Sequence, residues 1–258
     1  MSETDTDLAW EEWGKRDPYY GVITNPKFRR EGLTEEAKRE FFESGRLHAD
    51  YVLHMIAQYI DPTFRPRNAL DFGCGVGRLL VPLASRIPEV VGLDVSPSML
   101  QEAQRNCEAH GISNVRLLAS DDFISSLSQR FDLIHSYIVF QHIPADRGRL
   151  IFRKLVAHLS PGGVGAVHFV YSKAQYSSTN GVAPRTIPAA PASVLENSRA
   201  KPLPASLPPG ADPEMQMNPY HPTELLFILQ SAGVLRFHTE FTDHGGELGL
   251  FIFFQKPH

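Results

Sequence analysis

Apolar positions recur with two different periods along this chain, and the periods divide it into regions. From Asn68 to about residue 170, short apolar runs alternate with segments whose apolar residues recur every three or four positions. The first pattern is typical of buried β-strands, and the second of helices with one apolar face. Strands are expected at 68–72, 89–94, 114–118, 131–138 and 163–170, and helices at about 77–86, 97–109 and 146–159, with a short helix near 121–128. This alternation predicts an α/β fold whose parallel sheet is covered on both faces, the doubly wound class.

The N-terminal region does not follow this alternation. Residues 1 to about 8 are expected to be a frayed tail, and both tryptophans fall in a short aromatic segment after it. A helix is expected from Thr34 to Ile60, because apolar residues form a stripe along it and Asp61-Pro62 ends it. We therefore expect residues 1–64 to form a helical extension or cap, and residues 65–258 to form the main domain.

The C-terminal region combines a proline-rich stretch with regular elements. Ten of the twenty prolines lie between Ala183 and Pro222, which disfavours regular helix or central strand there. Residues 172–221 are accordingly expected to be an insertion, either a lid over the site or a disordered segment. A helix at 223–232 and two β-like runs at 234–242 and 248–254 follow. The short connection between these runs favours a hairpin, and therefore an antiparallel pair at one edge of the sheet.

A glycine-rich turn, Asp71–Gly77, directly follows the first expected strand. Glycines allow positive φ and let a ligand approach the backbone closely, so this strand, turn and helix together resemble a nucleotide-binding element. Asp94 ends the next strand, seventeen residues after Gly77. A carboxylate at this place can hold the ribose hydroxyls of a bound nucleoside, although it can also cap the helix that Ser96-Pro97 begins.

Composition limits the classes of protein that this chain can belong to. Its 258 residues are 42% hydrophobic, carry a formal net charge of −4 and contain no block of Lys or Arg, so no nucleic-acid partner is expected. Two cysteines cannot form a disulfide framework, and the acidic start lacks the features of a signal peptide. No apolar run reaches about 18 residues, so no membrane span is expected. These features predict a cytoplasmic protein and specify no oligomeric state.

Five segments in this order resemble the class I S-adenosylmethionine-dependent methyltransferases. They are ALDFGCGVGRLL (69–80), VVGLDVSPSML (90–100), LLASDDF (117–123), FDLIHSYIVFQHIP (131–144) and LSPGGVGAVHF (159–169). With the closing hairpin, the resemblance covers roughly residues 65–170 and 222–256. It implies a Rossmann-like seven-stranded sheet with its last strand antiparallel. It also implies S-adenosylmethionine as the methyl donor and S-adenosylhomocysteine as its product.

The resemblance implies a cofactor site residue by residue. The methionine part would contact Asp71 and the turn formed by Gly73, Cys74, Gly75 and Gly77. The ribose would contact Asp94; the adenine would contact Val95, Met99, Asp121 or Asp122, and Phe123; and Ser136 and Tyr137 would line the sulfonium. Tyr20 and Arg46 could close over the cofactor, with Arg46 pairing to its carboxylate.

Structural alternatives stand beside several of these roles. Met99 can equally be a core residue of its helix, and Asp122 can be a helix N-cap. Cys74 is expected to be a small filler rather than a nucleophile, because no base is visibly paired with it. Tyr20 and Arg46 can be ordinary packing and surface residues.

The acceptor is approached by elimination. The Asn/Asp-Pro-Pro-Tyr/Phe motif of adenine and glutamine methyltransferases, the double-Glu loop of arginine methyltransferases and a carboxylate cluster for a metal are all missing from the expected places. This leaves a small molecule, or a sugar or glycan, methylated most simply on oxygen by in-line displacement. His142 is the candidate general base, although it can also be a packing or hydrogen-bonding residue, whereas His135 and His168 lie inside strands and are expected to be core residues.

Two other classes share part of the pattern. A non-catalytic S-adenosylmethionine-binding partner or regulator would carry the same glycine turn. An NAD(P)-dependent oxidoreductase would also carry it, but its G-x-G-x-x-G spacing puts the third glycine one residue later than Gly77.

Overall fold

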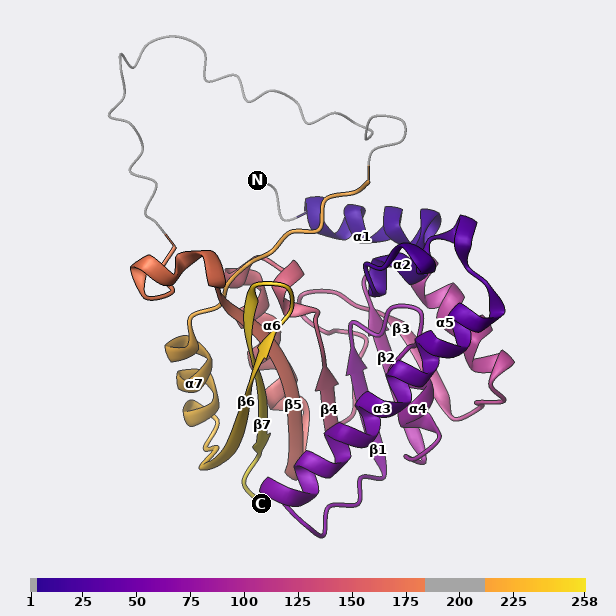
Figure 1. Ribbon diagram of the computed structural model, residues 1–258. Helices are drawn as coiled ribbons and strands as arrows, with labels where there is room; N and C mark the ends of the chain where they lie inside the picture. The colour runs from indigo at the N-terminus through magenta and orange to yellow at the C-terminus, as the bar shows by residue number, and fades with distance from the viewer. Residues whose placement is uncertain (1–3, 184–211) are drawn as a thin grey trace, which may run out of the picture.

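The structure is a computed structural model that describes residues 4–183 and 212–258, and its centre is one seven-stranded sheet (Figure 1). The strands lie in the order β3-β2-β1-β4-β5-β7-β6. Their bounds are β1 (Asn68–Phe72), β2 (Glu89–Asp94), β3 (Val115–Ala119), β4 (Phe131–Ser136), β5 (Leu159–Lys173), β6 (Arg236–Asp243) and β7 (Glu247–Gln255). The first five strands are parallel, and β7 runs antiparallel to both β5 and β6. The predicted sheet with an antiparallel last strand is confirmed.

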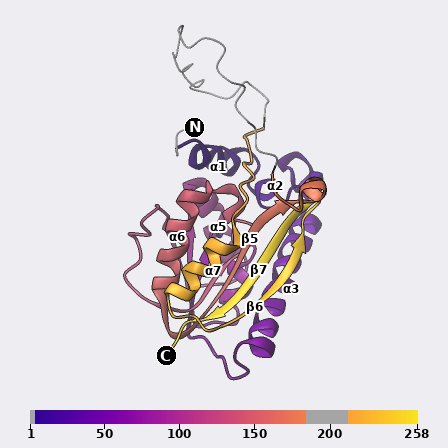
Figure 2. The same cartoon turned by 90° about the vertical axis from the view of Figure 1, so that its left-hand side faces the viewer.

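Helices cover both faces of this sheet (Figure 2). They are α1 (Thr4–Arg16), α2 (Pro18–Val22), α3 (Glu35–Tyr59), α4 (Leu80–Ala84), α5 (Pro97–Ala109), α6 (Ala145–His158) and α7 (Pro222–Ser231), with 3₁₀ turns η1 (Pro26–Phe28), η2 (Arg30–Gly32), η3 (Phe140–His142) and η4 (Ala174–Thr179). One apolar core packs helices α1, α2, α3, α4 and α5 against one face of the sheet. A second packs α6 and α7 against the other face. Because both faces are covered, the central strands are apolar nearly throughout.

Helix α3 packs closely against the glycine turn. A Cβ built on Gly45 would lie 2.0 Å from the carbonyl oxygen of Arg78, so only glycine allows this approach. Thr34 caps the helix by accepting from the backbone N–H of Ala37 at 3.1 Å. The contact brings the predicted N-terminal extension onto the main sheet, while the division at residue 64 remains a prediction.

Three expectations about local structure are wrong. Residues 121–128 form turns rather than a helix, because the Asp121 carboxylate accepts the backbone N–H groups of Phe123 and Ser125 and holds a non-helical loop. Helix α4 begins at Leu80 rather than near residue 77, because Gly77 adopts a φ of 89°. The expected tail at residues 1–8 is helical from Thr4, and Thr6 donates to the carbonyl of His142 at 2.8 Å.

The structure describes only the two ends of the proline-rich insertion predicted at 172–221. Strand β5 extends to Lys173, three residues beyond the predicted end, and residues 184–211 lie outside the described residues. The expectation of a lid stays a prediction. Within the part of the chain that the structure describes, no helix has both the length and the apolar character needed to cross a bilayer.

Candidate functional site

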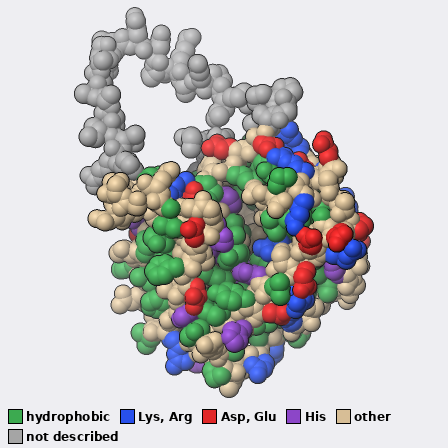
Figure 3. Space-filling view, in the orientation of Figure 1, with side chains coloured by type: hydrophobic (Ala, Val, Ile, Leu, Met, Phe, Trp, Pro, Cys, Tyr) green, Lys and Arg blue, Asp and Glu red, His purple; other side chains and the backbone are tan. Residues whose placement is uncertain are grey.

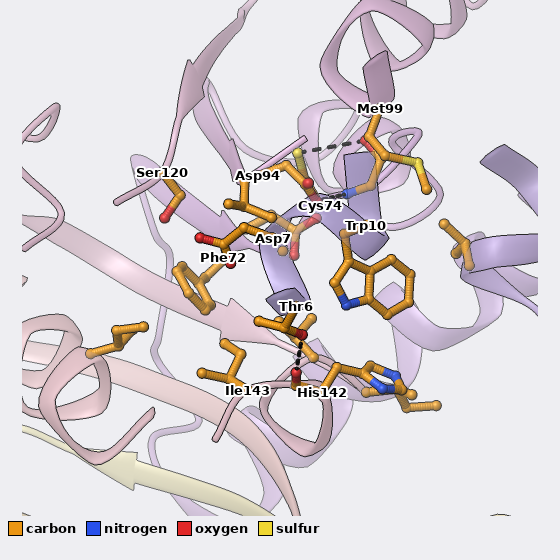
Figure 4. A pocket seen from close by; sticks show the side chains of 18 of the residues that line it. Thr6, Asp7, Trp10, Phe72, Cys74, Asp94, Met99, Ser120, His142 and Ile143 are labelled. Atoms are coloured by element: carbon orange, nitrogen blue, oxygen red, sulfur yellow. Dashed lines mark hydrogen bonds between the residues drawn. The ribbon is translucent and has the colours of Figure 1, made fainter. Parts of the chain in front are cut away.

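A pocket lies at the carboxyl ends of β1, β2 and β4, with α1 along one side (Figure 4). Such an edge is where parallel sheets bind ligands, because loops diverge there. The predicted site residues that line it are Asp71, Gly73, Cys74, Gly75, Asp94, Val95, Met99, Asp121, Asp122, Tyr137 and His142. Sequence positions from four separate motifs therefore meet in one cavity.

The glycine turn is held by the neighbouring strand. The backbone N–H groups of Gly73 and Cys74 both donate to the carbonyl of Leu93, at 2.8 and 3.0 Å. Gly73 has a φ of 73°, and a Cβ there would lie 2.4 Å from the side chain of Val139. The turn thus needs glycine at this position for its conformation and for its contact with the loop after β4.

Asp94 is almost fully buried at the end of β2, and both of its oxygens accept backbone hydrogen bonds. Oδ2 accepts from the N–H of Gly75 at 2.8 Å, and Oδ1 accepts from the N–H of Ser96 at 2.9 Å. Burial raises the pKa of Asp94 to about 6, and the two backbone hydrogen bonds limit the rise. Each oxygen keeps a second lone pair, so the carboxylate can also accept ligand hydroxyls.

Asp71 and Arg78 present unsatisfied polar atoms at the pocket. Asp71 lies at 2% exposure; its Oδ1 contacts Nδ1 of His135 at 2.8 Å. Among the described residues, Oδ2 of Asp71 and Nε of Arg78 are buried without a hydrogen-bond partner. Both residues line the pocket. Leaving such groups unpaired is costly, so the pair favours a ligand with both an anionic and a cationic group.

Sequence reasoning did not single out Arg78. Its place directly after Gly77, at the end of the glycine turn, was the feature that could have indicated it as a site residue. Burial lowers the pKa of Arg78, and the carboxylate of Asp71 opposes that change. Arg78 therefore puts a positive charge beside the turn without an ion-pair partner among the described residues.

Five predicted site residues do not line the pocket: Gly77, Phe123, Ser136, Tyr20 and Arg46. Ser136 is buried and donates to the carbonyl of Phe72 at 3.0 Å, whereas Phe123 is 73% exposed. Arg46 pairs with Glu43 and Asp50 on its own helix.

The ring of Tyr20 lies against the guanidinium of Arg29 at 3.6 Å. These partners lie on other elements or on other turns of a helix, and for this reason a motif could not indicate them.

Helix α1 is held beside the pocket by the side chains of Asp7 and Glu11. Arg147 of α6 binds Asp7 through two hydrogen bonds of 2.7 Å and also contacts Asp122. Glu11 accepts from Ser96 and Ser98 at the start of α5. Asp122 pairs with Arg147, and because no helix begins directly after it, the alternative role as an N-cap is wrong; its role toward adenine stays a prediction.

His142 is buried beside Trp10, with ring centroids 4.8 Å apart. Its Nδ1 lies 2.8 Å from the carbonyl oxygen of Gln216, which can only accept, so Nδ1 donates; Nε2 is the accepting nitrogen and lies 3.4 Å from the side-chain nitrogen of Gln141. Burial lowers the pKa of His142 to about 4, and the ring is therefore neutral near pH 7. A neutral imidazole can accept a proton, although its low pKa makes it a weak base.

Cys74 behaves as a buried small residue. Burial raises the pKa of its thiol well above the usual range, so the reactive thiolate is disfavoured.

A group of histidines adjoins the pocket beyond Tyr137, and sequence reasoning did not assemble it. Tyr137 lies next to His48 of α3, His168 of β5 and His244 of the β6–β7 turn, with ring centroids 4.1, 5.0 and 5.8 Å apart. Nε2 of His48 lies 3.2 Å from Nε2 of His135. His135 and His168 are each 1% exposed, as expected of strand residues in the core.

Comparison with known proteins identifies a family that matches the central part of the chain. Residues 69–163 match the family described as a methyltransferase domain. Over 102 residues the chain is 42% identical to trans-aconitate 2-methyltransferase of Deinococcus radiodurans, and the match covers 39% of this chain and 36% of that relative. Over 118 residues it is 32% identical to ubiquinone biosynthesis O-methyltransferase of Coxiella burnetii, covering 43% and 49% respectively. The chain thus spans half or less of these relatives.

A solved structure extends the likeness to the whole fold. The fold is similar to that of magnesium protoporphyrin IX methyltransferase from Synechocystis PCC 6803 with bound S-adenosylhomocysteine. The superposition covers 99% of this chain and 100% of that chain, with a TM-score of 0.64 at 16% sequence identity. This likeness shows the shared fold. With the domain match it identifies the class: the chain contains a methyltransferase domain.

Proposed function

We propose that this protein binds S-adenosylmethionine in the pocket under α1 and transfers its methyl group to an oxygen of a small molecule. The observation that carries the proposal is the pair of unsatisfied atoms, Oδ2 of Asp71 and Nε of Arg78. The methionine end of the cofactor has an ammonium group and a carboxylate, which complement an acceptor and a cationic donor. Arg78 takes the role that the sequence suggested for Arg46.

The other parts of the pocket fit the remaining groups of the cofactor. Asp94 keeps lone pairs for the ribose hydroxyls, and Val95 and Met99 offer apolar contacts for the adenine. When bound, the cofactor supplies an activated methyl group on a positive sulfur. Tyr137 and Ile138 would border the reacting centre, and the backbone of Ile138 is held at an unusual φ of 59° for a β-branched residue.

The protein's part in the reaction is to align the acceptor, exclude water and receive a proton. Helix α1 shields the pocket through Thr6, Asp7 and Trp10. His142 is our candidate to accept the acceptor's proton, because it lines the pocket and its Nε2 is the unprotonated nitrogen of the ring. Two matched relatives are named for small-molecule methylation, of trans-aconitate and in ubiquinone biosynthesis, which supports a small acceptor here. A sugar or glycan acceptor is the second candidate.

Ligand truncation tests the cofactor proposal. Arg78→Gln should weaken S-adenosylhomocysteine binding about 10–100-fold, since it removes a charge-assisted hydrogen bond. Binding of methylthioadenosine, which lacks the amino acid part, should change less than about threefold. Arg46→Gln is the matched control and should leave both affinities unchanged. Calorimetric titration measures all of them, and equal losses for the two ligands in Arg78→Gln would overturn the assignment.

Turnover separates an enzyme from a cofactor-binding partner. Transfer of labelled methyl from S-adenosylmethionine to a product in cell-extract fractions would support catalysis. Binding without transfer across those fractions would favour the non-catalytic alternative, and thermal stabilisation by NAD but not by S-adenosylhomocysteine would favour an oxidoreductase.

A further inference from the structure

The histidines beyond Tyr137 are not used by the proposed cofactor site. His48, His168 and His244 come from α3, β5 and the β6–β7 turn, and each lies against the ring of Tyr137. Tyr137 itself lines the cofactor pocket. In Figure 3, histidine side chains lie at the walls of a hollow in the middle of the face shown. We call His48, His168, His244 and Tyr137 the histidine subsite.

A buried aromatic ring lies behind the subsite. Phe251 of β7 is 1% exposed, and its ring lies 5.1 Å from that of Tyr137 and 5.7 Å from that of His48, stacked at 19° in the second case. Tyr51 lies 6.3 Å from the same ring. Flat apolar rings on several sides favour a planar ligand.

The subsite also has hydrogen-bonding atoms that the protein leaves unused. Nδ1 of His168 is buried without a partner, although Nε2 of the same ring contacts Oγ1 of Thr242 at 2.8 Å. Nδ1 of His48 has no hydrogen-bond partner among the described residues, while its Nε2 contacts His135. The unpaired buried nitrogen of His168 costs about 1–3 kcal/mol, which a bound polar group would offset.

The chain Asp71–His135–His48 determines which nitrogen of His48 can accept. An ionised carboxylate only accepts, so Nδ1 of His135 donates to Asp71 and its Nε2 accepts from Nε2 of His48. Nδ1 of His48 then holds a free lone pair. A ligand hydroxyl can donate to it.

The charge of the subsite is low. Burial lowers the pKa of His48 to about 2 and that of His168 to about 3, and it lowers the pKa of His244 as well. These rings are therefore neutral at ordinary pH. Arg78 is the nearby cation, and the proposed function assigns its charge to the carboxylate of the cofactor. Neutral rings give little compensation for the desolvation of a polycarboxylate.

We propose that the histidine subsite binds the methyl acceptor and that this acceptor is an uncharged planar ring with a hydroxyl group, such as a phenol, rather than a polycarboxylate. The hydroxyl donates to Nδ1 of His48, which then takes its proton in place of His142, and the ring lies against Tyr137, which lines the cofactor pocket. This inference rests on the proposed function, because the subsite adjoins the cofactor pocket through Tyr137. It separates this protein from the matched relative named for trans-aconitate.

Binding to the S-adenosylhomocysteine complex tests the inference with three probes. p-Cresol carries the hydroxyl, p-xylene has a methyl group in its place, and trans-aconitate carries three carboxylates. The dissociation constants, measured by ligand-observed NMR, should be about tenfold lower for p-cresol than for either other probe. The reason is that losing a hydroxyl partner costs about 1–3 kcal/mol. Tighter binding of trans-aconitate, or no binding of p-cresol, would overturn the proposal.

Variants assign that preference to the subsite. His48→Phe keeps an aromatic ring on Phe251 but removes the acceptor, and should reduce the preference for p-cresol over p-xylene at least threefold. His244→Ala changes an exposed turn residue, should fold normally and should weaken both aromatic probes. His54→Phe is the matched control on the exposed side of α3 and should change nothing.

A preference that survives both subsite variants would contradict the assignment. S-adenosylhomocysteine affinity is measured in parallel. If the wild type fails to bind that ligand, the proposed function fails; if only the probe preferences fail, the acceptor inference fails alone.

Discussion

On the cofactor side of the pocket, Asp94 and Gly73 are held by backbone atoms of the adjacent strand, turn and helix start. On the proposed acceptor side, His48, His168 and His244 meet from elements that are far apart in the chain. The cofactor side depends on residues close together in the chain, so it can be recognised as a sequence pattern. The second depends on side-chain packing between elements, so its composition can vary without changing the fold. We expect changes on the first side to affect cofactor binding and stability together, and changes on the second to affect acceptor choice.

The largest expected effect is that of Gly73→Ala. A residue with a Cβ is strained at φ 73°, and its Cβ would lie 2.4 Å from Val139, so we expect a loss of about 2–4 kcal/mol in the free energy of unfolding. S-adenosylhomocysteine affinity should fall about 100-fold or more. Gly111→Ala is the matched control, because Gly111 has a φ of 66° but no atom within 4 Å of the added Cβ. Equal losses in urea unfolding for the two variants would show that the contact with Val139 is unimportant.

Acid should destabilise the protein through His142. Its folded-state pKa of about 4 lies below the ordinary 6.5, so the unfolded chain binds a proton more readily as the pH falls below 6.5. The resulting loss approaches about 2 kcal/mol at pH 5. His142→Asn keeps a donor toward Gln216 and removes the titration, so its unfolding free energy should decrease less between pH 7 and pH 5. If the two proteins lose equal stability over this interval, His142 is not a buried neutral group.

Asp94 should give cofactor binding its own pH dependence. Burial holds its pKa near 6, and only the ionised carboxylate accepts two ribose hydroxyls, so S-adenosylhomocysteine affinity should fall about tenfold between pH 7.5 and pH 5. The free energy of unfolding changes with pH in the opposite direction to the affinity. Because the folded-state pKa of Asp94 is raised, this group stabilises the fold at low pH, and that contribution is lost as the pH rises through 6. Asp94→Asn should bind more weakly at pH 7.5 and show little change with pH. A variant that keeps the wild-type pH profile would contradict this.

The smallest expected effect concerns the tie between α1 and α6. Asp7→Asn weakens the pair with Arg147 and should lower the free energy of unfolding by about 1 kcal/mol. S-adenosylhomocysteine should dissociate a few times faster in stopped-flow measurements, because α1 lies beside the pocket. Glu12→Gln, which changes the more exposed pair with Arg16 on the same helix, is the control and should leave the dissociation rate unchanged. Equal dissociation rates for all three proteins would show that this tie does not slow release of the ligand.

The sequence predicted the sheet, its antiparallel last strand and residues from four motifs that meet at one pocket. Those features depend on the spacing of apolar residues, on glycine turns and on carboxylates at strand ends. All of these can be read from short stretches of the chain. It did not predict the chain Asp71–His135–His48, because its members come from β1, β4 and α3. Nor did it predict that Arg46 would pair on its own helix while Arg78 faces the pocket, since either cation could have reached a carboxylate.

The amino-acid sequence by itself determined where strands and helices alternate and where the backbone can turn with positive φ. It therefore determined the class of fold and the glycine turn. Only the tertiary structure decided which side chains lost their solvent, which found partners and which were left unsatisfied at the pocket. The physical reason is that burial and hydrogen bonding depend on neighbours in space, whereas apolar period and turn chemistry depend on neighbours in the chain.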